Sequence, residues 1–167
     1  MMQNLKLGSL AGILLGFGIM MGSAPQGLSL PKLWISQSIS SQEVPVEVED
    51  RLVEGMGQGM QGHYPEAIRI FSRLIQEYPN YADAYHNRGI AQAKLGNKKA
   101  AIADQQQAVR MNTELAEAHQ ALGLLLLDEG NKDQGIEHLQ IAAQLYQKQG
   151  NKIAHNRVTK QLQSLQP

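Results

Sequence analysis

The chain has 167 residues, which is enough for one ordinary domain with additional segments. Its 15 basic and 15 acidic side chains balance, so it lacks the concentrated positive charge that binding to nucleic acid requires. Because the sequence contains no cysteine, a disulfide scaffold, a thiol nucleophile and a thiolate metal site are all excluded.

The N-terminal residues 1–24 contain a stretch without charge, Leu7–Ala24, which directly follows Lys6. As a helix, this stretch would be about 27 Å long, close to the thickness of the hydrocarbon core of a bilayer. Such a run is typical of a secretory signal peptide or of an uncleaved membrane anchor. Both alternatives stay open, because Pro25 directly follows the small residues that a signal peptidase would recognise. We expect this segment to contact a membrane, and the protein to be exported or membrane-anchored, with the extracytoplasmic side favoured.

Residues 25–47 have the composition of a flexible linker. Three prolines, Pro25, Pro31 and Pro45, interrupt helices, and several serines make the stretch polar. Trp34 is the exception, because a tryptophan close to an apolar segment is typical of a membrane–water interface. It is equally consistent with a single hydrophobic spot in a disordered linker.

Small residues recur at intervals of 34 positions in the rest of the chain, which indicates a repeat architecture. Glycine recurs once in each interval where a helix is expected and once where a turn is expected. The recurring positions are Gly55, Gly89 and Gly123; Ala67, Ala101 and Gly135; Leu74, Ala108 and Ala142; and Gly62, Gly96 and Gly130. Pairs of antiparallel helices need small residues wherever their axes come close together, so these columns predict paired helices.

The period divides residues 48–149 into the three units 48–81, 82–115 and 116–149. This sequence resembles the tetratricopeptide repeat family, whose pattern is Trp-x2-Leu-Gly-x2-Tyr, then Ala-x3-Phe, then Pro. Three units in one register, without an insertion, make the resemblance specific. The residues that carry it are Gly55, Ala67, Phe71 and Pro79 in the first unit, Tyr85, Gly89 and Ala101 in the second, and Leu122 and Gly123 in the third.

The resemblance implies an all-α fold, a right-handed superhelical solenoid of three helix-turn-helix repeats with a capping helix over residues 150–167. Apolar residues at helical spacing support it in the first unit, where Pro79 should end the second helix. Asn131 and Gln134 have the spacing of a capping box at the start of the last repeat helix. In residues 150–167, apolar side chains alternate with polar ones as a solenoid cap requires.

In this family the first helices of successive repeats line a groove, so the resemblance implies that a protein or peptide partner binds there. The groove should be apolar in its centre, with a rim of acidic residues at Glu49, Asp83, Glu117 and Asp128. In the alternative interpretation, several of the apolar residues simply pack against a neighbouring helix. The candidate groove residues are Leu52, Met56, His86, Asn87, Ile90, Lys94, Gln120, Leu124 and Leu127.

One subclass of the family binds acidic C-terminal tails through a clamp of lysine, arginine and asparagine side chains. The corresponding positions here hold Leu52, Met56, Asn87, Glu117 and Ala121. Only the asparagine fits, and the glutamate has the opposite charge to the residue required. We therefore expect no carboxylate clamp.

Catalysis and metal binding find little support in the sequence. His86 and His119 lie on equivalent helices of adjacent repeats and could approach each other, but no recognised metal-ligand spacing is present. A phosphate-binding glycine loop and a serine nucleophile elbow are also missing from the sequence. We therefore expect neither an enzyme nor a bound cofactor or metal. The five histidines are His63, His86, His119, His138 and His155.

These observations predict a protein–protein interaction module that captures a peptide segment and assists the assembly of a complex. The alternative is a structural role, in which the repeats self-associate weakly or serve as an accessory subunit without a ligand of their own.

Overall fold

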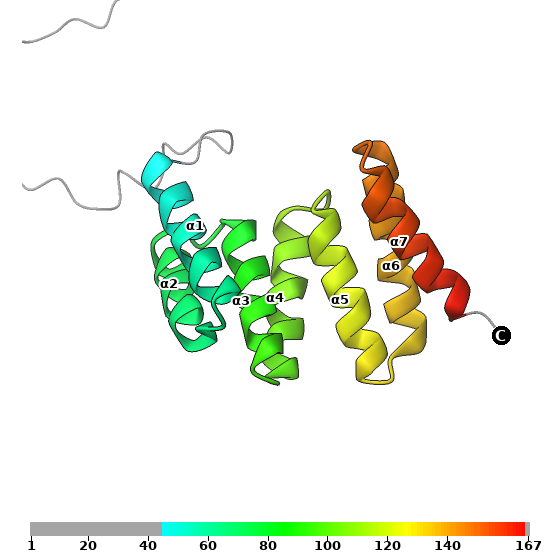
Figure 1. Ribbon diagram of the computed structural model, residues 1–167, viewed down its shortest axis with the longest axis horizontal. Coiled ribbons are helices and arrows are strands. Elements are labelled where there is room, and N and C mark those ends of the chain that lie inside the picture. The colour runs from blue at the N-terminus through cyan, green and yellow to red at the C-terminus, as the bar shows by residue number, and fades with distance from the viewer. Residues whose placement is uncertain (1–44, 166–167) are drawn as a thin grey trace, which may run out of the picture. The chain divides into compact units, whose positions relative to one another are not determined.

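The computed structural model describes residues 45–165, and within this range the chain forms helices and no strand. Figure 1 shows the helices in a row that runs from α1 and α2 at one end to α6 and α7 at the other. The prediction of an all-α helical solenoid is therefore confirmed. The helices are α1 (Val46–Met60), α2 (Tyr64–Glu77), α3 (Ala82–Lys94), α4 (Lys98–Met111), α5 (Ala116–Asp128), α6 (Lys132–Lys148) and α7 (Lys152–Ser164).

Each helix packs against the next one in the sequence, so α1 to α6 form three pairs and α7 packs on α6. One pair falls within each predicted 34-residue unit, but α1 begins at Val46, within the segment assigned to the linker. Pro45 precedes this helix, and its carbonyl oxygen accepts a hydrogen bond from the N–H of Val48 at 2.9 Å. The two acidic residues of the first turn, Glu47 and Glu49, favour a helix start there because they face the positive end of the helix dipole.

The predicted signal or anchor, residues 1–24, and the predicted linker up to residue 44 lie outside the described residues. Among the helices of residues 45–165, none combines the length and the hydrophobicity needed to cross a bilayer.

Two hydrophobic clusters form the core, one around each end of the row. Phe71 and Leu74 of α2 anchor the first cluster, and Leu139 and Tyr146 of α6 anchor the second. Val158 of α7 is fully buried in the second cluster, so α7 covers the apolar side of α6 as a capping helix does.

The predicted capping box at the start of α6 is wrong. Asn131 makes no side-chain capping hydrogen bond, and its ψ of 66° lies outside the extended region in which such caps usually form. Its backbone N–H instead donates to the carbonyl oxygen of Leu126 at 2.8 Å, in the turn that ends α5. That turn requires glycine because Gly130 has a φ of +84°.

The paired helices come closest at the first glycine column, Gly55, Gly89 and Gly123. A Cβ atom on Gly123 would lie 2.8 Å from the carbonyl oxygen of Gly135 and 2.9 Å from Cγ of Leu139. Because the nearest of these atoms belongs to the backbone of α6, it cannot move aside as a flexible side chain would. At Gly123 the small residue therefore permits close contact of the two helix backbones, whereas Gly55 makes room for the ring of Phe71.

Two histidines lie between α5 and α6, and they are not the two that the sequence suggested. Nδ1 of His119 lies 3.0 Å from Nδ1 of His138, whereas His86 is buried beside Gln105. A hydrogen bond at this distance requires that one imidazole donates and the other accepts, so the accepting ring is neutral. Burial lowers the pKa of both histidines, and the neighbouring His138 lowers that of His119 further, against an opposing contribution from the Thr113 backbone.

We predict opposite effects for two glycine-to-alanine changes in helix interiors. Gly57→Ala should stabilise the protein by about 0.5–1 kcal/mol, because nothing lies within 4 Å of its added Cβ and alanine favours the helix. Gly123→Ala should destabilise it by about 1–3 kcal/mol through overpacking. Thermal unfolding followed by circular dichroism measures both, and equal changes in the two variants would contradict the helix contact.

We also predict that the histidine pair makes the stability depend on pH. An unfolded histidine titrates near pH 6.5, and both pKa values are lower in the folded protein. The unfolded chain therefore binds more protons as the pH falls below about 6.5, so the free energy of unfolding decreases from pH 7 towards pH 5. His138→Gln should reduce this decrease in urea titrations at the two pH values. His63→Gln, which changes an exposed histidine, is the control, and equal pH dependence in both variants would exclude the pair as its source.

Candidate functional site

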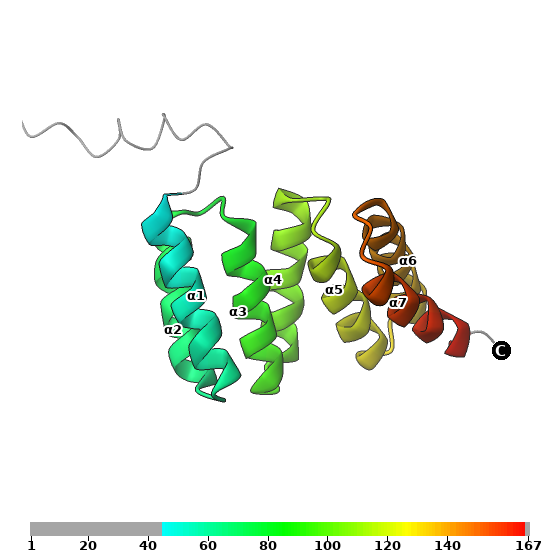
Figure 2. The same ribbon diagram turned by 45° about the horizontal axis from the view of Figure 1, so that its top comes forward.

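The first helices of the three repeats share one face of the row. α1 contacts α3 and α3 contacts α5, whereas α2, α4 and α6 do not approach one another as closely. Because the first helices contact one another and the second helices lie further apart, the row of helices curves towards the first helices. We call the surface formed by α1, α3 and α5 on this side the inner face (Figure 2).

Three large apolar side chains occupy the same position in successive repeats on this face. Met56, Ile90 and Leu124 are separated by 34 residues each, and their exposed fractions are 43%, 40% and 39%. We call these three residues the apolar row. Side chains of this kind are usually buried, so a regular exposed set marks a surface suited to a partner.

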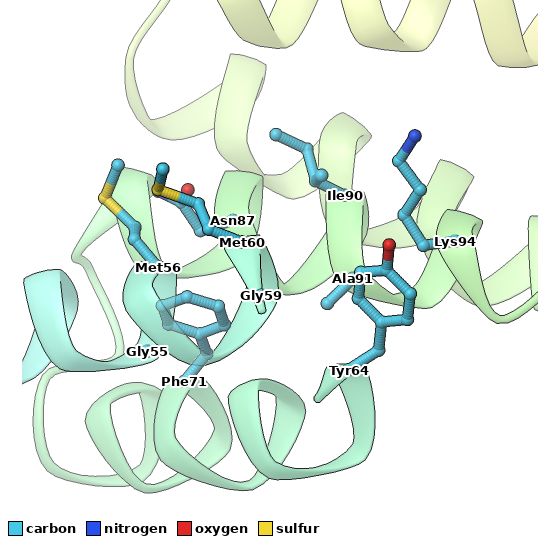
Figure 3. A pocket seen from close by; sticks show the side chains of 10 residues that line it. All are labelled: Gly55, Met56, Gly59, Met60, Tyr64, Phe71, Asn87, Ile90, Ala91 and Lys94. Atoms are coloured by element: carbon cyan, nitrogen blue, oxygen red, sulfur yellow. The ribbon is translucent and has the colours of Figure 1, made fainter. Parts of the chain in front are cut away.

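A pocket of about 340 Å³ lies between α1 and α3 beside the apolar row (Figure 3). Met56 and Met60 of α1 and Ile90 of α3 supply apolar walls, and Lys94 contributes a charge. Methionine adapts its shape readily, so these walls suit an apolar side chain that enters from solvent. The residues that line the pocket are Gly55, Met56, Gly59, Met60, Tyr64, Phe71, Asn87, Ile90, Ala91 and Lys94.

Five of the nine candidate residues lie on the open part of the inner face. Met56, Asn87, Ile90 and Lys94 line the pocket, and Leu124 continues the apolar row on α5. The sequence analysis did not select Tyr64, which reaches the pocket from the first turn of α2. The sequence feature that could have identified Tyr64 is an aromatic residue in the first turn of the second helix of a repeat.

The other four candidates point towards the protein interior. Leu52 packs against the first core cluster, and His86 is buried with its Nδ1 2.9 Å from Oε1 of Gln105. Oε1 of Gln120 accepts a hydrogen bond of 2.9 Å from the hydroxyl of Tyr146.

Leu127 lies over Gly135 of α6, where its Cγ would be only 2.7 Å from an added Cβ. For the two apolar residues, Leu52 and Leu127, the alternative interpretation of packing against a neighbouring helix describes their position.

Asn87 lines the pocket and is also hydrogen-bonded to the backbone of its own helix. Its Nδ2 donates to the carbonyl oxygen of Asp83 at 2.8 Å, which fixes the orientation of the side-chain amide. Among the described residues nothing donates to its Oδ1, and a peptide N–H could do so.

Carboxylates flank the inner face at a second repeated position, held by Glu49, Asp83 and Glu117. Burial raises the pKa of Tyr81 to about 12, with smaller contributions from Asp83 and Glu49. Burial likewise raises the pKa of Tyr146 to about 12, and Glu117 adds to the shift. Each of the three carboxylates therefore lies close enough to a tyrosine hydroxyl to affect its pKa.

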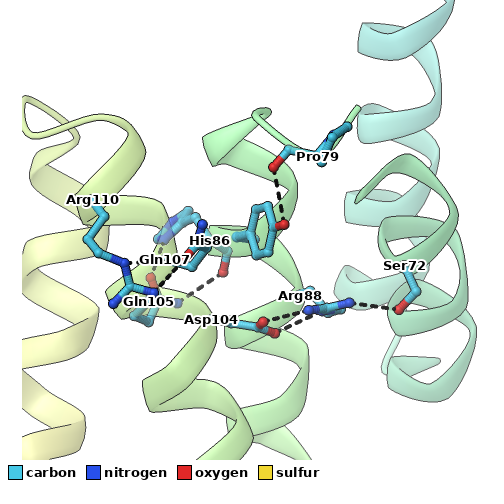
Figure 4. A network of polar contacts seen from close by, with 9 residues as sticks. Ser72, Pro79, His86, Arg88, Asp104, Gln105, Gln107 and Arg110 are labelled. Carbon is cyan, nitrogen blue, oxygen red and sulfur yellow. Dashed lines mark hydrogen bonds and ion pairs between the residues drawn. The ribbon is translucent and has the colours of Figure 1, made fainter. Parts of the chain in front are cut away.

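An ion pair that the sequence analysis missed connects α2, α3 and α4. Nε and Nη2 of Arg88 donate to the two carboxylate oxygens of Asp104 at 2.9 and 2.6 Å, and Nη1 donates to Ser72 at 3.2 Å (Figure 4). The hydrogen bonds to Asp104 raise the pKa of Arg88. The available signal was an aspartate at the position that holds Ile70 in the first repeat. The arrangement fixes the second repeat against the first and so holds the walls of the pocket.

Comparison with known proteins identifies relatives with the same kind of repeat. The tetratricopeptide repeat family matches residues 53–116. Tetratricopeptide repeat protein 36 from Danio rerio is 30% identical over 118 residues, which cover 68% of this chain and 63% of that protein. The chain thus spans less than two thirds of that relative's length.

Two solved structures show the same fold. The TPR2B domain of yeast Sti1, solved as a pHsp70 complex, has a TM-score of 0.67 at 22% identity, over 72% of this chain and 96% of that chain. The type III secretion chaperone SycD from Yersinia enterocolitica, solved with a peptide of the translocator YopD, has a TM-score of 0.67 at 19% identity. That match covers 73% of this chain and 94% of the SycD chain. With its repeated glycine columns and three helix pairs, this chain belongs to the tetratricopeptide repeat family.

Proposed function

We propose that the inner face binds a peptide segment of another protein and that the chain serves as a protein–protein interaction module. The observation that carries this proposal is the exposed apolar row beside the pocket between α1 and α3. Full burial of such a side chain is worth about 1.5–3 kcal/mol. Covering the 39–43% that is exposed here therefore contributes roughly 1 kcal/mol for each residue. Peptide capture uses the exposed residues without requiring any catalytic group.

Two proteins of the same fold support the proposal, because both were solved with a bound partner. SycD was solved with a peptide of the translocator YopD, and the Sti1 domain was solved as a pHsp70 complex. Both share their fold with this chain at low sequence identity, so they support the kind of ligand and not its identity. A role in assisting the assembly of a complex follows from capture of one of its components.

We predict that the double change Ile90→Asp and Leu124→Asp weakens peptide binding by about tenfold to several-hundredfold. Helix content and melting temperature should change little, because both side chains are already partly exposed. Peptides selected from a phage-displayed library against the full chain would be titrated into the wild type and the variant by isothermal calorimetry.

The matched control changes two exposed residues away from the inner face, Ala103→Asp on α4 and Ile153→Asp on α7. It adds the same charge and should leave binding unchanged. If the Ile90 and Leu124 variant unfolds, the row belongs to the core. If it instead loses self-association in sedimentation experiments while peptide binding persists, the alternative of a self-associating structural protein is favoured.

We further propose that residues 1–24 direct the chain to a membrane, on the basis of the uncharged run Leu7–Ala24 after Lys6. We predict that the full chain sediments with membranes on cell fractionation, or is recovered outside the cytoplasm, and that a chain without residues 1–24 remains in the cytoplasmic fraction. Recovery of both forms in the cytoplasmic fraction would contradict this proposal.

A further inference from the structure

We propose that the segment captured by the inner face is cationic and amphipathic, with lysine or arginine side chains along one flank of its apolar side. The inference rests on the proposed function and names the chemistry of the partner. It follows from the order in which charge and apolar surface are arranged across the first helices.

The three carboxylates Glu49, Asp83 and Glu117 form an acidic row parallel to the apolar row. Each stands seven residues before the apolar residue of its own helix, as in the pair Glu49 and Met56. Seven residues are almost two full turns, so both side chains leave the helix in nearly the same direction. The two rows are therefore about 10 Å apart along the helix axes.

Other charges on the structure do not cancel the acidic row. Lys98 pairs with Asp128 at 2.6 Å, Arg51 pairs with Glu77 at 2.8 Å, and Arg88 is held by Asp104. Arg157 of α7 lowers the pKa of Tyr146, which Glu117 raises, so this base offsets the charge of the acidic row at α5. The acidic row is therefore most negative at α1 and α3.

Lys94 places a base on α3 on the side of the apolar row opposite Asp83. It follows Ile90 by four residues, which places it about 6 Å beyond the apolar row along α3. Along α3 the order is thus acidic, apolar and basic, whereas α1 and α5 have Met60 and Asp128 at the position of Lys94. This order selects the orientation of a bound segment as well as its composition.

A bound helix fits these dimensions. Helices are about 10–12 Å in diameter, so one that lies along the apolar row brings its flank close to the carboxylates. Lysine and arginine can extend their apolar stems over the row while their charged ends reach the acidic side chains. A segment with glutamate on that flank would instead place like charges together, at a site that lacks the bases of a carboxylate clamp.

Three synthetic peptides test the inference. They share one leucine-rich helical face and differ only in the flank, which carries lysine, glutamine or glutamate. Titrated into the full chain at low salt, the lysine peptide should bind roughly three- to thirtyfold more tightly than the glutamine peptide, and the glutamate peptide most weakly. The differences should shrink at about 0.5 M salt, because the carboxylates are at the surface.

Charge reversal identifies the side chains responsible. Glu49→Lys with Glu117→Lys should abolish the preference for the lysine peptide, since both glutamates are exposed. Asp133→Lys with Glu137→Lys on α6 changes the net charge equally and should preserve it.

Equal affinity for all three peptides, with loss of binding in the Ile90 and Leu124 variant, would overturn the inference and leave the proposed function intact. An equal loss of preference in both charge variants would also overturn it, because the effect would then reflect net charge. Absence of binding by all three peptides would contradict both.

Discussion

Close contact between the two helices of each repeat is the constraint on which the rest of this structure depends. Where Gly123 faces Gly135, the backbones approach so closely that an added Cβ has no space. This contact turns the large residues of each second helix, such as Leu139, into the core. It also fixes which side of each first helix remains outside. The inner face is therefore a consequence of helix pairing, and its exposed side chains can vary without loss of the fold.

A period of 34 residues converts single positions into rows that cross several helices. The apolar row and the acidic row each take one residue from α1, α3 and α5, although the residues are far apart in the sequence. A substitution in one repeat changes one residue of a row and leaves the residues from the other two repeats unchanged. The binding surface can thus be tuned one repeat at a time, while residues such as Arg88 and Asp104 keep adjacent repeats in a fixed relation.

Composition and spacing were sufficient to predict the helices, their pairing and the residues of close contact. They were insufficient to predict the direction of every side chain, because one position along a helix turns a side chain by about 100°. His86 and Asn87 are neighbours, yet one is buried beside Gln105 and the other lines the pocket. Leu127 turned inwards because Gly135 leaves room for it, a fact that depends on two helices at once. The cap expected at Asn131 failed for a similar reason, since the preceding turn fixes its backbone.

The capping helix α7 has a consequence for the way the chain is synthesised. The main contacts join helices that are adjacent or nearly adjacent in the sequence, so each pair can form soon after its second helix leaves the ribosome. The apolar side of α6 has no such early partner, because Ala154 and Val158 complete its cluster only when α7 has been made. Until translation reaches that point, the nascent chain exposes the apolar surface that α7 later covers, and such surface favours aggregation.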